Sequence, residues 1–209
     1  MASTNLFLII MTLIMFTIRT CNSAFPSAIL VFGDSTVDTG NNNYIKTLFK
    51  GNFYPYGEDF PGKIPTGRFS NGKLVPDILA SLLGIKETVP PFLDPALSND
   101  ELLTGVSFAS AGSGFDELTT AASKVILVSK QIELFKAYIV RLKGIVGEEK
   151  AKKIISESLV IVSAGTNDLI FNFYDLPTRK FQFTISEYQD FLLAKLQSFV
   201  KVTHINLIW

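Results

Sequence analysis

Apolar residues follow two patterns along the chain, and the two patterns predict different elements. Short apolar runs bounded by glycine and other turn formers are typical of strands that are buried in a parallel sheet. Three such runs cover residues 29–32, 105–109 and 159–162. Elsewhere, helical spacing of apolar residues predicts helices at 74–83, 129–143, 148–156 and 188–199, and a further helix is expected at 41–49. Strands that alternate with helices predict an α/β fold, with a parallel sheet and helices on both of its faces.

Small and polar residues follow each predicted strand. Ser35 follows the first strand, Gly112 lies in the loop after the second, and Asn167 follows the third. Because open α/β sheets bind ligands at the carboxyl ends of their strands, we expect these three residues to converge on one crevice. The residues leave a second interpretation of Ser35 open, in which it is a turn serine that caps the following helix.

These three residue types suit the hydrolysis of an acyl ester. The reaction needs a nucleophile that attacks the carbonyl carbon and N–H donors that face the resulting oxyanion. The Ser35 hydroxyl would be the nucleophile, and the donors would be the N–H groups of Ser35 and Gly112 and the side-chain amide of Asn167. The glycine-rich turns lack the spacing of a dinucleotide-binding fingerprint or a Walker lysine. With one histidine and no clustered carboxylates, we expect no metal site.

The segment 52–73 is dense in glycine, proline and aromatic residues, which predicts a long ordered loop rather than a linker. Long structured loops often bind ligands. The alternative is a loop whose aromatic residues only pack onto the sheet, and the sequence leaves both interpretations open.

Residues 1–23 have the features of a secretory signal peptide, namely an apolar core followed by small residues near a cleavage position after Ser23. A signal anchor is the alternative, but the core is short for a membrane span of about 20 residues. We therefore expect a secreted, extracellular protein, with the cell wall as one destination. The remaining domain, 24–209, has no other segment that we expect to span a membrane.

Removal of this leader changes the charge and the cysteine content. The chain has 19 basic and 19 acidic residues, and Arg19 is the only charged residue of the leader, so one net negative charge remains. This balance predicts no electrostatic attraction to nucleic acid or to a charged membrane. Cys21, the only cysteine, also leaves with the leader, so core burial rather than a disulfide must stabilise the fold.

Four motifs occur in a fixed order along the chain. They are Phe32-Gly33-Asp34-Ser35 with Asp38-Thr39-Gly40-Asn41-Asn42-Asn43, then 65–72, then 106–114, then Gly165-Thr166-Asn167-Asp168. Together they resemble the sequence blocks of the plant GDSL esterase/lipase family, within the SGNH hydrolase superfamily. The Gly-Asp-Ser triplet alone is a weak signal, whereas the four motifs in order make a specific match over about residues 32–201.

The resemblance implies a fold, a reaction and roles for the site residues. The fold would be a three-layer α/β/α sandwich with a parallel, flavodoxin-like sheet. Ser35 would be the nucleophile, and Gly112 and Asn167 would complete the oxyanion hole. The substrates would be small-molecule or lipid esters, including acyl and acetyl esters of lipids or of the cell wall, and no cofactor would be needed.

The chain departs from the family pattern near residue 204. The family completes its catalytic machinery with an Asp-x-x-His block, but Lys201 stands three residues before the single histidine, His204. We therefore expect His204 to be an incidental residue rather than the catalytic base. We also expect the domain 24–209 to lack the final segment and its strands, with residues 205–208 adding at most an edge strand.

Three hypotheses about function follow. The first is a secreted serine ester hydrolase, with weak or no activity because the acid–histidine pair is missing. The second is a non-catalytic protein that binds esters or acts as a decoy, and the third is an unstable truncated isoform. The sequence does not specify the acyl chain, the alcohol or the oligomeric state.

Overall fold

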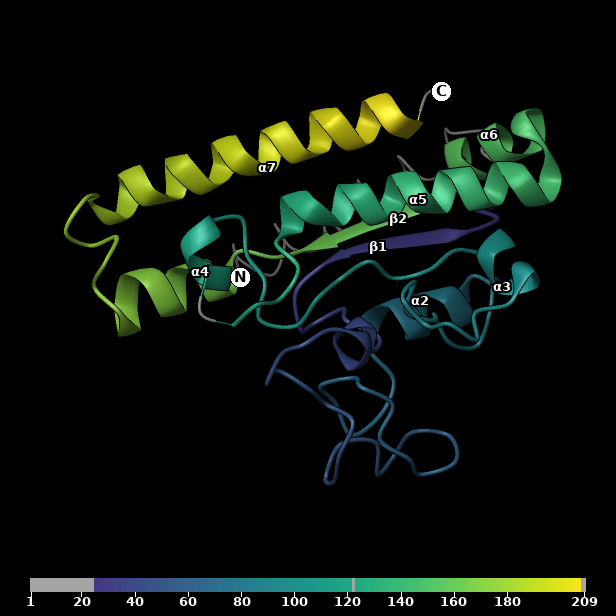
Figure 1. Ribbon diagram of the computed structural model, residues 1–209, viewed down its shortest axis with the longest axis horizontal. Coiled ribbons are helices and arrows are strands. Elements are labelled where there is room, and N and C mark those ends of the chain that lie inside the picture. The colour runs from purple at the N-terminus through teal and green to yellow at the C-terminus, as the bar shows by residue number, and fades with distance from the viewer. Residues whose placement is uncertain (1–24, 122, 208–209) are drawn as a thin grey trace, which may run out of the picture.

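The computed structural model describes residues 25–121 and 123–207, and the expected signal peptide at 1–23 lies outside this part of the chain. Figure 1 shows how the helices and strands are arranged. In chain order, the elements are β1 (Ile29–Gly33), η1 (Asn41–Tyr44), α2 (Val75–Leu82), α3 (Asn99–Leu103), α4 (Glu117–Ala121), α5 (Val128–Val146), α6 (Glu148–Ser156), β2 (Leu159–Ser163), η2 (Asp168–Asp175) and α7 (Ile185–Leu207). The segment η1 is a 3₁₀ helix and η2 is a π-helix.

β1 lies between two parallel neighbours. Along one edge, β1 pairs with β2 over the full length of both strands. Along the other edge lies the predicted strand 105–109, where the Phe108 N–H donates to the Val31 carbonyl at 2.7 Å. This segment forms an isolated parallel bridge at Ser107 rather than a regular strand. Both predicted neighbours of β1 are therefore present, one of them in an irregular form.

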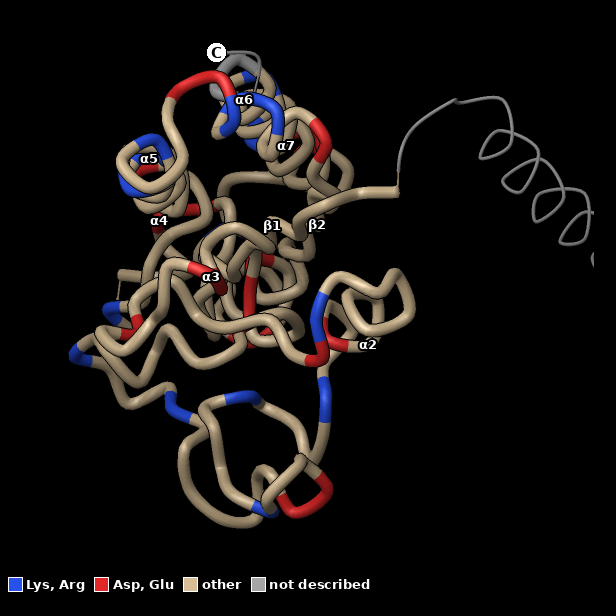
Figure 2. The backbone as a smooth tube through the Cα atoms, turned by 90° about the vertical axis from the view of Figure 1, so that its right-hand side faces the viewer, with Lys and Arg blue, Asp and Glu red and all other residues tan. Residues whose placement is uncertain are grey.

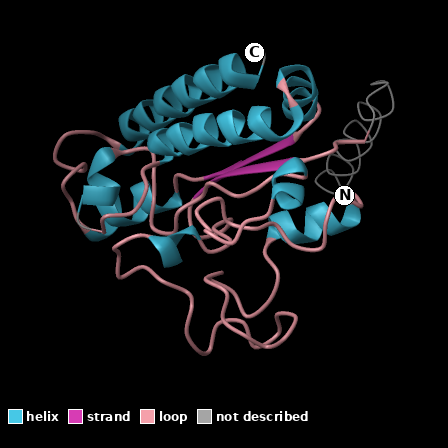
Figure 3. Cartoon of the chain, turned by 45° about the vertical axis from the view of Figure 1, so that its right-hand side comes forward, coloured by secondary structure: helices cyan, strands magenta, loops and turns pink. Residues whose placement is uncertain are grey.

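Helices cover both faces of these strands. Leu30 and Phe32 of β1 belong to a core cluster with residues of α5 and α7, and the Phe32 ring centroid lies 5.6 Å from that of Phe135 and 5.5 Å from that of Phe199. The alternating residues of β1 belong to a second cluster, with Ala80 of α2. Figures 1 and 3 show α5 and α7 on one side of the strands and α2 on the other. These observations confirm the predicted α/β class.

Four of the predicted helices are confirmed. The segments 74–83, 129–143, 148–156 and 188–199 correspond to α2, α5, α6 and α7. α5 ends before Gly147, whose φ of 79° lies in the left-handed region that glycine tolerates.

Two of the expected secondary-structure elements are wrong. The helix at 41–49 is reduced to the short η1, because Asn41 and Asn42 direct their side chains to the carbonyl groups of a distant loop, at Ser107 and Ala111. The edge strand considered at 205–208 does not form in the described residues, because α7 continues to Leu207.

The segment 52–73 forms a lobe of loops at the bottom of Figure 1, on the side of the strands where α2 lies. Its aromatic rings either pack on one another, as Tyr56 and Phe69 do at 5.5 Å, or remain exposed, as Tyr54 does. None of its described residues belongs to the two apolar clusters around β1. The interpretation that these rings pack onto the sheet is therefore wrong, and a role of the lobe in binding stays a prediction.

A buried ion pair anchors this lobe. Arg68 donates from Nε and Nη2 to the two carboxylate oxygens of Asp77, at 2.8 Å each, and both side chains are buried. Arg68 also donates to the carbonyl oxygens of Val89, at 2.8 Å, and Thr39, at 3.2 Å. The lobe is thus connected to α2 and to the segment that follows Ser35.

Basic and acidic residues are interspersed along the chain, as Figure 2 shows. In the part of the chain that the structure describes, no helix combines the length and the apolar character needed to cross a membrane.

We predict that Arg68→Met lowers the free energy of unfolding by about 3–5 kcal/mol, because it leaves the buried Asp77 carboxylate without its partner. Urea unfolding measures this change. The matched control is Lys73→Met, which removes an ion pair with the exposed Glu87 and should cost under about 1 kcal/mol. Equal losses in the two variants would contradict the anchoring role of Arg68.

Candidate active site

Ser35 lies in a tight turn directly after β1. The Asp34 N–H donates to the Ser163 carbonyl at 2.9 Å, and Asp34 Oδ1 accepts the N–H and the hydroxyl of Thr36, at 3.0 and 2.8 Å. These bonds close the turn around Ser35, which is half-buried. Among the described residues, none forms a hydrogen bond with the Ser35 hydroxyl. The residue that caps η1 is Gly40, so the interpretation of Ser35 as a helix cap is wrong.

A buried glutamine of α5 holds the last residue of β1. Gly33 has a φ of 142°, and a Cβ atom there would overlap the Ser163 carbonyl, so the position requires glycine. The fully buried Gln131 accepts the Gly33 N–H and donates to the Gly33 carbonyl, each at 2.8 Å. The sequence analysis missed Gln131. The only available signal is a polar residue beside the apolar stripe of the predicted helix.

Asp38 joins the segment after Ser35 to the loop that carries Gly112. One of its carboxylate oxygens accepts the N–H groups of Gly40 and Asn41, and the other accepts the N–H of Ala111, all at 2.8 Å. Burial raises the pKa of Asp38 to about 6, although its backbone hydrogen bonds act in the opposite direction. The carboxylate thus holds Ala111, the residue before Gly112, in place. Its desolvation carries an unfavourable free energy.

Gly112 lies in a loop that leaves no room for a side chain. It is buried, its φ is 83°, and a Cβ atom there would lie 2.9 Å from the Phe49 ring. The next residue, Ser113, donates its hydroxyl to the Gly33 carbonyl at 2.8 Å. The Gly112 loop therefore packs directly against the end of β1.

Asn167 reaches the same loop from the end of β2. Its Nδ2 donates to the Ser113 carbonyl at 2.9 Å. An amide nitrogen carries two protons, so this contact uses one of two donors. On the other side, Thr36 Oγ1 lies 2.8 Å from Ser163 Oγ, which links the Ser35 turn to β2. The structure thus brings the three predicted loops together at the carboxyl ends of the strands.

Asp168, the residue after Asn167, fixes the backbone beyond Gly112. Its buried carboxylate accepts the N–H groups of Phe115 and Asp116, at 2.9 and 3.0 Å, and the hydroxyl of Thr119. Burial raises the pKa of Asp168, and these hydrogen bonds counteract the rise. The sequence analysis included Asp168 in a motif but assigned it no role.

Asp116 extends this hydrogen-bonded network to α7. Its carboxylate accepts Nε and Nη2 of Arg179, at 2.7 and 2.8 Å, and the hydroxyl of the buried Tyr188 at 3.0 Å. Burial alone would raise the pKa of Asp116, but the hydrogen bonds from Arg179 and Tyr188 contribute to a pKa below its ordinary value. The network braces the Gly112 loop against the rest of the fold.

His204 lies on a different part of the molecule. It is exposed near the end of α7 and lines a hollow of about 160 Å³ with Val160 and Val162 of β2. Ser35, by contrast, follows the carboxyl end of β1. That His204 is not the catalytic base stays a prediction.

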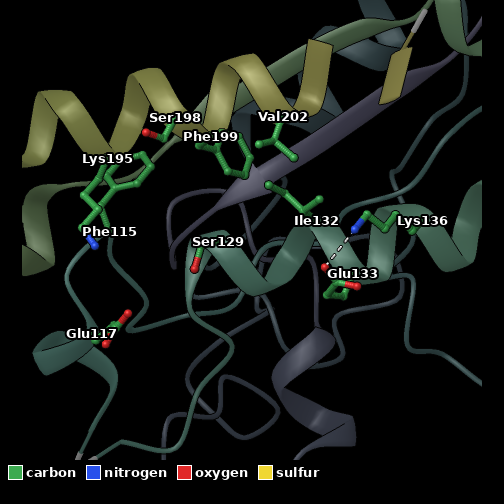
Figure 4. Close-up of a pocket in the computed structure, with 10 residues that line it drawn as sticks. All are labelled: Phe115, Glu117, Ser129, Ile132, Glu133, Lys136, Lys195, Ser198, Phe199 and Val202. Atoms are coloured by element: carbon green, nitrogen blue, oxygen red, sulfur yellow. Dashed lines mark hydrogen bonds and ion pairs between the residues drawn. The ribbon is translucent and has the colours of Figure 1, made fainter. Parts of the chain in front are cut away.

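The pocket in Figure 4 borders the segment beyond Gly112 but is not lined by the three proposed site residues. It has a volume of about 390 Å³ and lies between α5 and α7, with the rings of Phe115 and Phe199 and the Ile132 side chain among its lining residues. Ser35, Gly112 and Asn167 do not line it. Among the residues that the structure describes, no three His, Cys, Asp or Glu side chains are grouped so that they could hold a metal ion.

Comparison with known proteins gives one consistent result. Residues 29–207 match the family model described as GDSL-like Lipase/Acylhydrolase. The chain is 59% identical over 179 residues to GDSL esterase/lipase At1g06990 of Arabidopsis thaliana, covering 86% of this chain and 49% of that relative. It is 56% identical over 184 residues to GDSL esterase/lipase At2g30310 of the same plant, covering 87% and 51%. The chain thus spans about half the length of the curated relatives it matches. No solved structure matches it.

We predict that Asp38 makes the free energy of unfolding depend on pH. Its pKa rises from an ordinary value of 3.8 to about 6 on folding, so the folded state binds this proton more tightly than the unfolded state does. The contribution of Asp38 to the free energy of unfolding should therefore fall by about 3 kcal/mol as the pH rises through this interval. Urea unfolding at pH 3.5 to 7 checks this: the stability of the native chain relative to Asp38→Asn should fall by that amount. A difference that does not change with pH would contradict it.

We also predict that Gln131→Leu lowers the free energy of unfolding by about 1–3 kcal/mol, because the buried Gly33 N–H loses its acceptor. The control is Gln189→Leu on the exposed face of α7, which should change the free energy by less than about 0.5 kcal/mol. Urea unfolding of both variants at one pH gives the comparison, and a neutral Gln131→Leu would show that Gln131 does not support β1.

Proposed function

The chain belongs to the GDSL-like lipase/acylhydrolase family, whose members are carboxylic ester hydrolases, and we propose that its described residues form the nucleophile and the oxyanion hole of a serine ester hydrolase. The main support is the convergence of three loops at the carboxyl ends of the strands. Asn167 donates to the carbonyl of Ser113, next to Gly112, and the turn that carries Ser35 is hydrogen-bonded to the end of β2.

In the proposed reaction, the Ser35 oxygen attacks the carbonyl carbon of the ester and its proton passes to a base. The carbonyl oxygen becomes an oxyanion, which accepts hydrogen bonds from the Ser35 and Gly112 N–H groups and from the Asn167 amide. Collapse of this intermediate releases the alcohol and leaves an acyl-serine ester, which water then hydrolyses. The braced loops favour this reaction because donors held in place need little reorganisation when the charge forms.

The base of this reaction is a separate matter from the nucleophile and the oxyanion hole. The family resemblance calls for an acid and a histidine, whereas His204 lies beside β2 on α7. We therefore propose that a protein made of residues 24–209 hydrolyses esters slowly or not at all. The residual rate would come from binding and from the oxyanion hole alone.

The resemblance also suggests the setting of this reaction. We propose that the residues belong to the three-layer α/β/α sandwich of the SGNH hydrolases, and that the leader 1–23 directs the protein to secretion. The substrates would be acyl or acetyl esters of lipids or of the cell wall.

A second candidate function is ester binding without turnover. It is favoured by the Ser35 hydroxyl, which has no hydrogen-bond partner among the described residues. A base within hydrogen-bonding reach is what activates a serine nucleophile. An ester could therefore occupy the crevice without reacting.

Hydrolysis of p-nitrophenyl acetate by purified residues 24–209 tests the proposal. We predict that Ser35→Ala abolishes any turnover and that Asn167→Ala lowers kcat/KM by about 10²–10³-fold through loss of an oxyanion donor. The controls are Ser156→Ala and Asn99→Ala, at exposed positions of α6 and α3, and both should leave kcat/KM unchanged.

Turnover that survives Ser35→Ala would exclude Ser35 as the nucleophile. Without turnover, saturable binding of 4-nitroacetanilide, an amide analogue of the substrate, would favour the second function. The absence of a cooperative thermal transition would instead favour an unstable product.

A further inference from the structure

An apolar side chain stands almost entirely in solvent next to the candidate site. Leu48 is 97% exposed, more than any other large apolar residue that the structure describes. Phe53 and Tyr54, a few residues further along the chain, are 54% and 66% exposed. A single exposed apolar residue is ordinary, so the case for an interaction surface depends on what surrounds Leu48.

Two lysines flank Leu48. Lys46, Leu48 and Lys124 line a hollow of about 490 Å³ together with Thr47 and Ser123, and none of the described residues that line it is acidic. The Thr47 hydroxyl donates to the Ser123 carbonyl at 2.8 Å, so the two walls of this hollow are fixed to each other. The hollow therefore presents positive charge beside an exposed apolar tip.

This surface is continuous with the candidate active site. Phe49 follows Leu48, and its ring packs against Gly112. Asn42 Nδ2 donates to the Phe49 carbonyl at 2.7 Å and to the Ala111 carbonyl at 3.0 Å. A partner that contacts Leu48 would therefore lie next to Phe49, whose ring contacts the Gly112 loop.

We propose that Lys46, Leu48 and Lys124 form a docking surface for an anionic lipid bilayer. Leu48 would enter the boundary between headgroups and acyl chains, where an exposed leucine loses its unfavourable contact with water. The two lysines would lie at the level of the anionic headgroups. Docking would hold the crevice at the membrane surface, where bilayer lipids would be the source of ester substrates. In this last respect the inference rests on the proposed function.

The overall charge of the chain does not argue against this surface. Its near balance predicts no attraction to a charged membrane as a whole. Screening limits that argument, because at physiological ionic strength charges interact over about 8 Å. Within that range the headgroups interact with the lysines around Leu48 rather than with the net charge of the whole molecule.

Co-sedimentation with vesicles tests the proposal without any need for turnover. The probes are vesicles of phosphatidylcholine alone and vesicles that contain 30 mol% phosphatidylserine. We expect the protein to bind the anionic vesicles, to bind the neutral ones at least tenfold more weakly, and to lose affinity as salt increases. Lys46→Gln and Lys124→Gln should each lower the partition coefficient about fivefold, and Leu48→Ser should lower it about tenfold.

Matched controls separate docking from general effects of charge and hydrophobicity. Leu82→Ser removes a leucine that is 77% exposed at the end of α2, and Lys150→Gln with Lys152→Gln removes two exposed lysines of α6. Both controls should bind within twofold of the native chain. The proposal is overturned if the anionic vesicles do not bind, if the controls lose as much affinity as the tip variants, or if Leu48→Ser has no effect.

The outcome is independent of ester hydrolysis. Ser35→Ala should bind vesicles as the native chain does. If the proposed function is wrong, the protein should still bind the anionic vesicles. If docking fails, turnover of the soluble ester p-nitrophenyl acetate is unaffected. Circular dichroism of each variant checks that the fold is retained, which is expected because Lys46, Leu48 and Lys124 are exposed.

Discussion

Hydrogen bonds from buried side chains to loop backbone hold the candidate site together. Asp38, Gln131 and Asp168 each bond to two or more backbone groups, at the last residue of β1 or in the segments that follow the strands. Buried N–H and C=O groups need partners wherever they lie, and irregular loops cannot supply these partners locally. The polar side chains therefore satisfy the backbone N–H and C=O groups of these loops, as backbone hydrogen bonds between neighbours do in a strand.

This arrangement has an energetic cost that the apolar core must offset. Burial raises the pKa values of Asp38 and Asp168, which means that their charged forms are less favourable in the folded protein than in water. The aromatic cluster around Phe32, which β1 shares with α5 and α7, offsets this cost by removing large apolar surfaces from water. The same strand thus contributes both to the core and to the site, because its side chains pack on the helices while its carboxyl end leads into the Ser35 turn.

The helices and strands could be predicted from the sequence more fully than the structure of the loops. Apolar periodicity identified β1, β2 and the helices α2, α5, α6 and α7, since burial of one helix face or of a whole strand leaves a repeating pattern. The family motifs identified Ser35, Gly112 and Asn167 as candidates. The roles of Asp38 and Gln131 could not be predicted in this way, because their partners lie 73 and 98 residues away along the chain. The helix expected at 41–49 is lost for the same reason, because Asn41 forms long-range hydrogen bonds in its place.

The braced loops and the proton acceptor of the reaction are physically separate problems. Asp38 and Asp168 accept backbone N–H groups on either side of Gly112, and the Ser113 carbonyl accepts the Asn167 amide; all of these groups lie in described residues that precede α7. Their positions do not depend on which group removes the Ser35 proton. Under the proposed function, a chain with these residues would keep its oxyanion donors in place even where nucleophile activation is weak. In this chain the conformation of the Gly112 loop and the activation of Ser35 therefore have separate structural causes.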